Sequence, residues 1–424
     1  MSESAYSQIA NGTRSLTLAE AKNFAFQRNW DLLAARKGID IAIAQRVVAK
    51  EFPNPTLGAS IQKINVDTHP ASTIYGNGYW DRNYDTILAL NQLFEIGGKR
   101  KARQASATAS FEQARAQLWD ARRTLDQAVT KAYVAALLAE QNAKNLATSA
   151  RSLRKEAEIA QLRFKSGDIS RADKSQIEIA ADRFALDAAS SESSAKSARI
   201  AVDVLMAEPR PAGDWKPADS LESLGIQSFV DNGDKIGAAR PDVLAAQAAV
   251  KKAEADLKLQ KALRVPDPTV LAQYEHEPPD QPNTIGVSLS FPLPLWNRNR
   301  GNIKAAEATR DQLQMQLEKL RDQVFAEIAT AQTIYEDATA RWKQYESNIR
   351  PKSHDVLNTV EFAYRKGGAS LLDLLTAERN DNDIRLEAAK ALADRATAAA
   401  DLAAARNISD SKLPTERKNY EIVK

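Results

Sequence analysis

Apolar residues recur at seven-residue steps through the longest stretch of the chain that lacks a helix breaker. Residues 101–166 contain neither Gly nor Pro. One apolar row runs through Phe111, Leu118, Leu125, Ala132, Ala139, Leu146, Leu153 and Ala160. A sustained period of seven predicts a helix that supercoils against its neighbours, and alanine permits close helix approach. We therefore predict a coiled-coil helix over about 101–165 and, after Gly167, a return helix over about 170–206.

The second half of the chain repeats this pattern. Its heptad row comprises Leu317, Val324, Ala331, Ala338 and Tyr345. We predict long helices over about 302–405, with a kink or a looser turn at Pro351. A further helix is expected over Leu18–Phe52, before Pro53. The return helix covers only about half the length of the long helix, and Leu18–Phe52 supplies the missing length, which favours a hollow cylinder of helices.

Alternating positions predict strands between these helices. Ile285, Val287, Leu289 and Phe291 alternate with Thr284, Gly286, Ser288 and Ser290. This pattern is typical of a strand with one apolar and one small polar face, and it predicts a β-hairpin over about 269–295. A weaker alternation predicts a second hairpin over about 56–94. Four strands seldom stand alone, whereas three copies of the chain would supply twelve.

Motif pairs in the same order indicate an internal duplication. Residues 164–173, Phe-Lys-Ser-Gly-Asp-Ile-Ser-Arg-Ala-Asp, match residues 364–373, Tyr-Arg-Lys-Gly-Gly-Ala-Ser-Leu-Leu-Asp. Three further pairs lie upstream at similar offsets of about 200 residues, among them residues 93–100 against 292–299. We divide the chain into a first repeat, 1–212, and a second, 213–424. Segments 208–240 and 407–424 break the helical pattern and are expected to form a small mixed collar.

Composition excludes several classes of function. Lys and Arg total 58 against 55 Asp and Glu, so a net charge of +3 gives no reason to expect nucleic acid binding. Cysteine is absent, and no catalytic triad, phosphate loop or carboxylate–histidine cluster is present, so we expect neither an enzyme nor a cofactor. The three histidines are His69, His276 and His354. His69 and His276 fall near the hairpin loops of opposite halves. A metal-binding pair is one reading of them, but solvated side chains are the one we favour, so we assign no metal site.

The chain has no helical membrane span by sequence. No run approaches the ~18 apolar residues that a transmembrane helix needs. The first residues, Met-Ser-Glu-Ser-Ala-Tyr, lack a basic and apolar leader, so the chain is either not exported or a mature form. Tyr75, Tyr79, Trp80 and Trp296 are candidates for aromatic girdles at a membrane interface, with collar packing as the alternative.

The duplicated unit resembles the TolC-like outer-membrane factors. The resemblance rests on the strand–strand–long-helix order and on the motif aromatic-x-x-Gly-x-x-Ser-x-x-Asp at each helical turn. Residues 286–301 are similar to the branch that serves heavy-metal efflux of the cobalt–zinc–cadmium and copper–silver type. The resemblance implies a homotrimer with a twelve-stranded β-barrel in the outer membrane, an α-helical barrel across the periplasm and an equatorial collar. It also implies a periplasmic adaptor protein as partner and, through it, an inner-membrane pump of the RND type.

The resemblance also implies roles for the turn residues. The matching positions of the periplasmic gate are Asp173, Tyr364 and Asp373, and the turns that would dock the adaptor carry Gly167, Ser170, Gly367 and Ser370. Two positions depart from the pattern of better-known members. Ala369 stands where some have a gate arginine, and Thr376 where some have a second acid, so a ring of three Asp373 carboxylates would be the main charge. The alternative for both aspartates is an ordinary acid at a helix start.

Two further readings of the whole chain stay open from the residues alone. A soluble coiled-coil scaffold would explain the polar composition but not the exposed strand row Ile285, Val287, Leu289 and Phe291, which we expect to face lipid. A periplasmic adaptor protein would have one coiled-coil hairpin beside a lipoyl-like domain and no duplicated unit. Several members of the metal branch also carry an acylated N-terminal cysteine, which this chain lacks.

Overall fold

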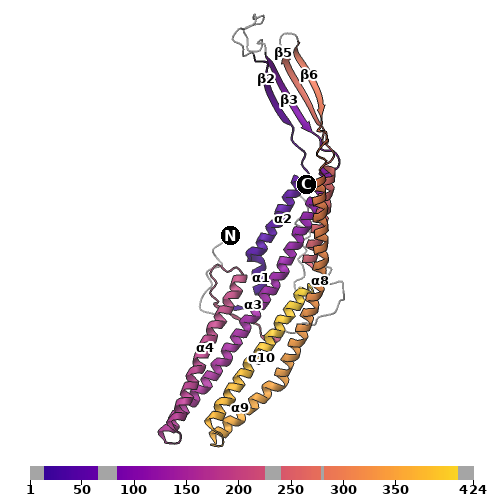
Figure 1. Cartoon of the computed structure of the whole chain (residues 1–424). Coiled ribbons are helices and arrows are strands. Elements are labelled where there is room, and N and C mark those ends of the chain that lie inside the picture. The colour runs from indigo at the N-terminus through magenta and orange to yellow at the C-terminus, as the bar shows by residue number, and fades with distance from the viewer. Residues whose placement is uncertain (1–13, 65–83, 225–239, 278–280, 409–424) are drawn as a thin grey trace. The chain divides into compact units, whose positions relative to one another are not determined.

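Long helices make up most of the described chain, so the mainly helical fold class is confirmed. The computed structural model describes residues 14–64, 84–224, 240–277 and 281–408 (Figure 1). Its helices are α1 (Leu18–Arg28), α2 (Trp30–Val48), α3 (Lys99–Lys165), α4 (Arg171–Leu205), α5 (Leu221–Leu224), α7 (Pro241–Ala262), α8 (Arg300–Gln344), α9 (Arg350–Arg365) and α10 (Leu371–Ala405). Helix α3 has 67 residues. At 1.5 Å per residue it is about 100 Å long.

The chain divides into two units. The first consists of Met1–Arg36, Gln117–Val243 and Leu320–Lys424, and the second of Lys37–Ala116 and Leu244–Lys319. Helices α2, α3, α7 and α8 contribute residues to both units. Both halves of the sequence therefore take part in each unit.

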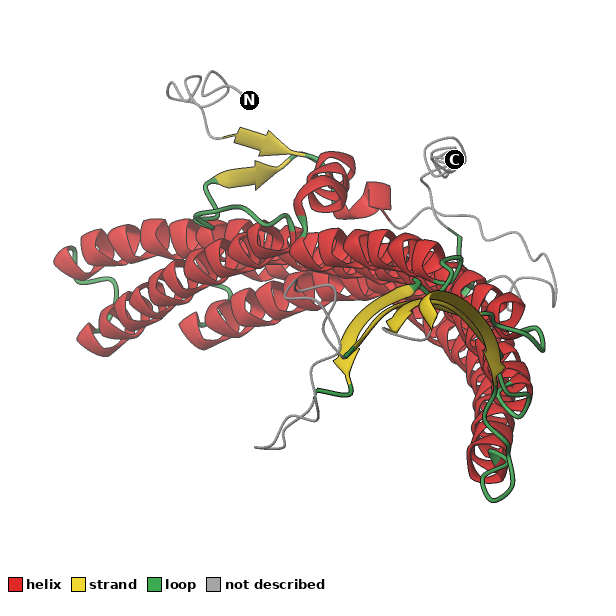
Figure 2. Ribbon diagram, turned by 90° about the horizontal axis from the view of Figure 1, so that it is seen from above, coloured by secondary structure: helices red, strands yellow, loops and turns green. Residues whose placement is uncertain are grey.

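In the second unit, four strands form one antiparallel sheet, curved as Figure 2 shows. The strands are β2 (Thr56–Gln62), β3 (Asp85–Leu93), β5 (Thr269–Glu277) and β6 (Gln281–Ser290), in the order β2-β3-β5-β6. The central pair, β3 with β5, joins strands from the two halves of the sequence. Strands β2 and β6 are the edges of this sheet.

The first unit contains a smaller sheet that is fixed to the long helices. Strands β1 (Arg14–Leu16) and β4 (Trp215–Pro217) pair in parallel. Tyr133 of α3 is fully buried, donates a hydrogen bond of 2.7 Å to the carbonyl of Leu16, and stacks on Trp215 with ring centroids 6.0 Å apart. The indole of Trp215 donates in turn to Asp203 of α4 over 2.8 Å. The described part of the predicted collar is thus anchored on α3 and α4, and β1, which the sequence analysis did not assign, belongs to it.

The helix expected over Leu18–Phe52 is two helices, because the side chain of Asn29 interrupts it. The Asn29 Oδ1 accepts hydrogen bonds from the N–H groups of Asp31 and Leu32, at 3.0 and 3.2 Å, and so caps α2. Its Nδ2 donates to the carbonyl of Leu205 over 3.1 Å. Asn29 is buried, so the break is a structural joint within the first unit.

Pro351 has a local effect on the second long helix. A π-helical turn, Tyr345–Ile349, follows α8, and α9 then starts at Arg350 with Pro351 in its first turn. Because proline has no N–H to donate, the preceding turn widens rather than continuing the α-helical ladder. The expected looser turn therefore takes the form of a π-helical insertion.

Among the described glycines of the first unit, Gly213 leaves the least room for a side chain. Its φ is +66°, and a Cβ would lie 2.9 Å from the backbone oxygen of Lys196. Its N–H donates to Asp203 and its carbonyl accepts from Arg199, both over 2.8 Å. The collar segment therefore passes α4 at a distance that only glycine permits.

We expect Gly213→Ala to lower the free energy of unfolding by about 1–3 kcal/mol, through backbone strain and the displaced α4 contacts. The matched control is Gly38→Ala in α2, where a Cβ has no neighbour within 4 Å. That substitution should raise stability by about 0.5–1 kcal/mol, since alanine is the better helix former. Urea unfolding followed by circular dichroism measures both. Equal effects of the two substitutions would contradict the assigned strain.

Candidate functional site

The two helical turns of the first unit share one construction. In the turn between α3 and α4, Gly167 has a φ of +84°, and in the turn between α9 and α10, Gly367 has a φ of +79°. Ser170 and Ser370 are the N-caps of the helices that follow. Because a left-handed glycine closes each helix and a serine opens the next, both chain reversals are tight and alike. This local chemistry explains the repeated Gly and Ser of the motif.

Asp173 and Asp373 complete a capping box at each turn. The N–H of Asp373 donates to the Ser370 Oγ over 3.2 Å. In return, the Asp373 Oδ2 accepts from the hydroxyl of Ser370 over 2.7 Å and from the backbone N–H of Ser370 over 3.0 Å. Asp173 does the same with Ser170. Hydrogen bonds from Ser370 hold the pKa of the Asp373 carboxyl below its ordinary value, so this carboxylate stays ionised. The helix-start role considered from the sequence is therefore present, and a gate role for these aspartates stays a prediction.

Tyr364 lies at the apolar cluster that joins the two helical hairpins near these turns. The buried members of the cluster are Leu153, Ala157, Ala160, Ile177, Ala180, Ala181, Phe184, Leu371 and Leu375. They come from α3, α4 and α10, and Tyr364 of α9 packs against them with Ile169. Burial raises the pKa of the Tyr364 hydroxyl, and the guanidinium of Arg163 lies 5.6 Å from its ring centroid. Tyr364 and Arg163 thus connect the α9–α10 hairpin to the end of α3.

A row of buried polar side chains on α10 faces α3 beyond this cluster. Glu378 and Asn382 are both buried. The hydroxyl of Ser152 lies 3.5 Å from the Glu378 Oε1, and the hydroxyl of Ser149 donates to the Asn382 Oδ1 over 3.2 Å. These contacts cross from one helical hairpin to the other. These contacts were not predicted from the sequence, although polar residues three and four apart on a helix rich in Ala and Leu were a usable signal.

Arg385, whose charge acts on Glu378, and Arg365 of α9 are both paired with other carboxylates. Arg365 of α9 bonds to Glu156 of α3 over 3.2 Å and also pairs with Glu361. Arg385 pairs with buried Asp381 over 2.6 Å. Burial, with the nearby charges of Glu361 and Asp381, raises the pKa of the Glu378 carboxyl to about 6, although Arg385 opposes the shift. Glu378 therefore titrates close to neutral pH at the contact between the hairpins.

In the second unit, strand register divides the sheet into two unlike faces. Cross-strand partners share a face, and one face holds Leu57, Ala59, Ile61, Leu88, Leu90, Val270, Ala272, Tyr274, Ile285, Val287 and Leu289, with Thr86, Gln92 and His276 as its polar members. Ile285, Val287 and Leu289 are 84%, 76% and 63% exposed. An apolar face that is open over all four strands is unusual for a sheet in water.

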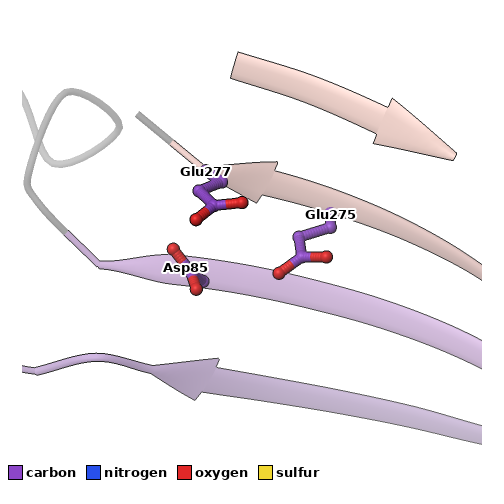
Figure 3. A group of neighbouring side chains, drawn as sticks. All are labelled: Asp85, Glu275 and Glu277. Carbon is purple, nitrogen blue, oxygen red and sulfur yellow. The ribbon is translucent and has the colours of Figure 1, made fainter. Parts of the chain in front are cut away.

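The opposite face is mostly small or polar. It includes Gly58, Ser60, Asn91, Gln273, Glu275, Thr284, Gly286 and Ser288. Where β3 begins and β5 ends, Asp85, Glu275 and Glu277 place carboxylate oxygens within 4.8 Å of one another (Figure 3). Lys63 bonds to Asp85 over 2.8 Å and to Glu277, so this acidic group is partly neutralised.

The histidines differ from expectation in one respect. His276 is buried in β5, on the apolar face, so the expected solvated side chain is wrong for this residue. The hydroxyl of its strand partner, Thr86, is buried, and the register places both residues on the face opposite to Asp85 and Glu275. His69, Tyr75, Tyr79 and Trp80 lie outside the described residues. None of the described helices combines the length and the apolar character needed to cross a membrane.

Comparison with known proteins gives matches along most of the chain. The family described as "Outer membrane efflux protein" matches residues 23–208 and 233–407. The cobalt-zinc-cadmium resistance protein CzcC of Cupriavidus metallidurans is 25% identical over 370 residues, which cover 86% of this chain and 83% of that protein. A membrane protein from Pseudomonas aeruginosa has a similar structure, with a TM-score of 0.79, 18% identity and 92% of each chain covered. CusC has a TM-score of 0.78, 17% identity and 95% of each chain covered. At these identities the two structures show a shared fold.

The titration of Glu378 should make the stability of the chain depend on pH. Because its folded pKa of about 6 lies above the ordinary 4.5, its burial is tolerated at low pH and costs stability as pH rises through 6. Glu378→Gln should therefore be more stable than the parent chain, by about 1 kcal/mol at pH 5 and about 2 kcal/mol at pH 7.5. Denaturant unfolding at the two pH values measures this difference. Glu158→Gln, at an exposed position of α3, is the control, and a gain for Glu378→Gln that does not grow with pH would contradict the assignment.

Proposed function

The chain belongs to the outer membrane efflux protein family, and on that premise we propose that it is the outer-membrane duct of a tripartite heavy-metal efflux system. As a member it is a channel of the outer membrane that extends into the periplasm, and it is not an enzyme. Outer-membrane factors of this kind form trimers in tripartite efflux systems. Family membership excludes the soluble scaffold and the adaptor protein as readings of the chain.

The proposed path through the membrane rests on the two unlike faces of the four-stranded sheet. One face is apolar across strands from both halves of the sequence, and the other carries Ser, Thr, Gln and carboxylate side chains. Such a sheet suits lipid on one side and water on the other. Because β2 and β6 are open edges, we propose that three chains join their sheets into one closed wall of twelve strands. Ile285, Val287, Leu289 and, just beyond β6, Phe291 then face the lipid.

The helical turns support the proposed periplasmic end. Gly167, Ser170, Gly367 and Ser370 form two turns of the same shape in each chain. Three chains would present six such turns, which suits repeated docking of an adaptor protein that links the duct to an RND-type pump in the inner membrane. Asp173, Tyr364 and Asp373 lie at or next to these turns, so we propose that they line the entrance.

Heavy-metal cations are the proposed cargo. The support is the likeness to CzcC, a cobalt-zinc-cadmium resistance protein, over 86% of this chain. The duct conducts what its pump delivers, and its polar sheet face and ionised Asp373 are compatible with cations.

Deleting the gene in its host tests the proposed cargo. Tolerance to cobalt, zinc, cadmium, copper and silver salts should fall, cell-associated metal should rise, and expression of the chain should restore both. Tolerance to organic efflux substrates such as dyes and detergents is the comparison. Loss of tolerance to organic compounds alone would contradict heavy metals as cargo while leaving the efflux role intact. Recovery of the chain as a detergent-free monomer would contradict the trimeric duct.

Single-channel recording tests the entrance. Asp373→Asn removes one charge per chain while keeping a side-chain oxygen for Ser370, so the turn should stay capped. If three Asp373 carboxylates surround the entrance, the variant should show weaker cation selectivity and weaker block by divalent cations in planar bilayers, by several-fold. Asp173→Asn, at the equivalent turn, is the matched comparison. Unchanged selectivity and block in Asp373→Asn would remove the proposed role.

A further inference from the structure

The exposed apolar row of β6 continues after the strand ends. Phe291, Leu293 and Leu295 keep the two-residue spacing of the row and are 53%, 64% and 60% exposed. Pro292 and Pro294 stand between them. Proline favours extended backbone and has no N–H that needs a partner, so the row can leave the sheet without unpaired donors at these two positions. Trp296 follows and is 93% exposed.

This segment is held in place by its far end. Asn299 has a φ of +58° and donates from Nδ2 to the carbonyl of Gln260 in α7 over 2.8 Å. Its N–H donates to the Asn297 Oδ1 over 3.0 Å, and its Oδ1 accepts from the Asn302 amide over 2.7 Å. The segment is therefore a positioned loop between β6 and α8, and the exposure of Trp296 is a property of the fold.

Arg298 and Arg300 lie on either side of Asn299 and have no protein partner within the described chain. Arg298 and Arg300 are exposed. Within the part of the chain that the structure describes, neither guanidinium group takes part in an ion pair, a hydrogen bond or an aromatic contact. Two unpaired guanidinium groups beside an exposed tryptophan form a surface with both apolar and cationic character.

The equivalent segment of the first half is built differently. Lys99, which matches Arg298, is buried and pairs with Asp267 over 2.6 Å. Arg100 donates to the carbonyl of Lys50 over 2.9 Å and lies 3.7 Å from the ring centroid of Phe52. At the same offset, Arg100 matches Asn299, and Lys101, which matches Arg300, is exposed like Arg300. The two halves therefore differ at Lys99 and Arg298: Lys99 is satisfied within the fold, whereas Arg298 is exposed. Arg298 is therefore accessible to a ligand from outside the described chain.

We propose that the segment Phe291–Arg300 is a lipid anchor: Leu293, Leu295 and Trp296 enter the apolar edge of the periplasmic leaflet, and Arg298 and Arg300 bind the phosphate groups of anionic phospholipids. The segment continues the lipid-facing row of β6 and leads into α8, so the inference rests on the proposed function. Tryptophan prefers the membrane interface. One guanidinium group can donate two parallel hydrogen bonds to the oxygens of a phosphate group. Basic residues close to a membrane surface also favour anionic lipid.

Quenching by brominated lipids tests the anchor. The full-length protein is reconstituted into phosphatidylcholine vesicles that contain a small fraction of brominated phosphatidylglycerol or of brominated phosphatidylcholine. The difference in fluorescence between the parent protein and the Trp296→Phe variant is the signal of Trp296. We expect Trp296 to be quenched by both lipids, with a preference for phosphatidylglycerol on the order of tenfold. The preference should decrease at high salt, because the attraction is between charges.

The double variant Arg298→Gln, Arg300→Gln should lose this preference while Trp296 stays quenched by phosphatidylcholine. Arg341→Gln with Lys343→Gln removes the same charge from exposed positions at the other end of α8 and should keep the preference. The two single variants replace the double variant if that one fails to assemble. Equal quenching of the parent protein by the two lipids, or a preference that survives the loss of both arginines, would overturn the proposal.

The same experiment separates this inference from the proposed function. Insertion with channel current but without quenching of Trp296 would overturn the anchor alone. Failure to insert into either kind of vesicle would overturn both the anchor and the duct. Pairing of Arg298 or Arg300 with a second copy of the chain would appear as loss of the trimer in the variants, with no lipid preference in the parent protein.

Discussion

The backbone groups along the two edges of the four-stranded sheet constrain the rest of this molecule. Strand β2 pairs only with β3, and β6 only with β5, so within one chain each edge leaves N–H and C=O groups without strand partners. In a bilayer each such group costs several kcal/mol if it stays unpaired. A sheet with an open apolar face and two open edges is therefore incomplete alone. Other copies of the chain can meet that need, as in the proposed wall of twelve strands.

The same logic holds at the two helical turns of the first unit on a smaller scale. Each turn in the first unit satisfies its own backbone through a glycine, a serine and an aspartate, so the turns need nothing from each other. The hairpins are joined instead by side chains: an apolar cluster near the turns, and buried polar contacts of Glu378 and Asn382 farther along α10. The contact between the hairpins is thus made by side chains alone, and it includes the Glu378 carboxyl, whose pKa is raised to about 6 by burial.

Patterns that depend on neighbouring residues were readable from the sequence, and contacts between distant segments were not. The alternation at Ile285, Val287 and Leu289 indicates the exposed apolar side of β6, because spacing alone fixes the face of a strand. The pairing of β3 with β5 joins residues about 180 apart, and no local pattern specifies it. Burial of Glu378 and His276 depends on such packing, so both were missed or misread. The Asn29 break was also missed, because one capping side chain outweighs an otherwise helical pattern.

Duplication explains why the two halves share turns and strands, and their divergence indicates what each half does. Where a residue serves only the backbone, as at Ser170 and Ser370, the halves agree. Where a residue faces the surroundings, they differ: Lys99 is buried in an ion pair, whereas its counterpart Arg298 is exposed and unpaired within the described chain. The ion pair with Asp267 explains Lys99 within the fold, and no contact of the described chain explains Arg298 in the same way. The difference therefore points to the medium outside the protein, and an anionic lipid surface is the partner whose chemistry fits an exposed tryptophan followed by two free guanidinium groups.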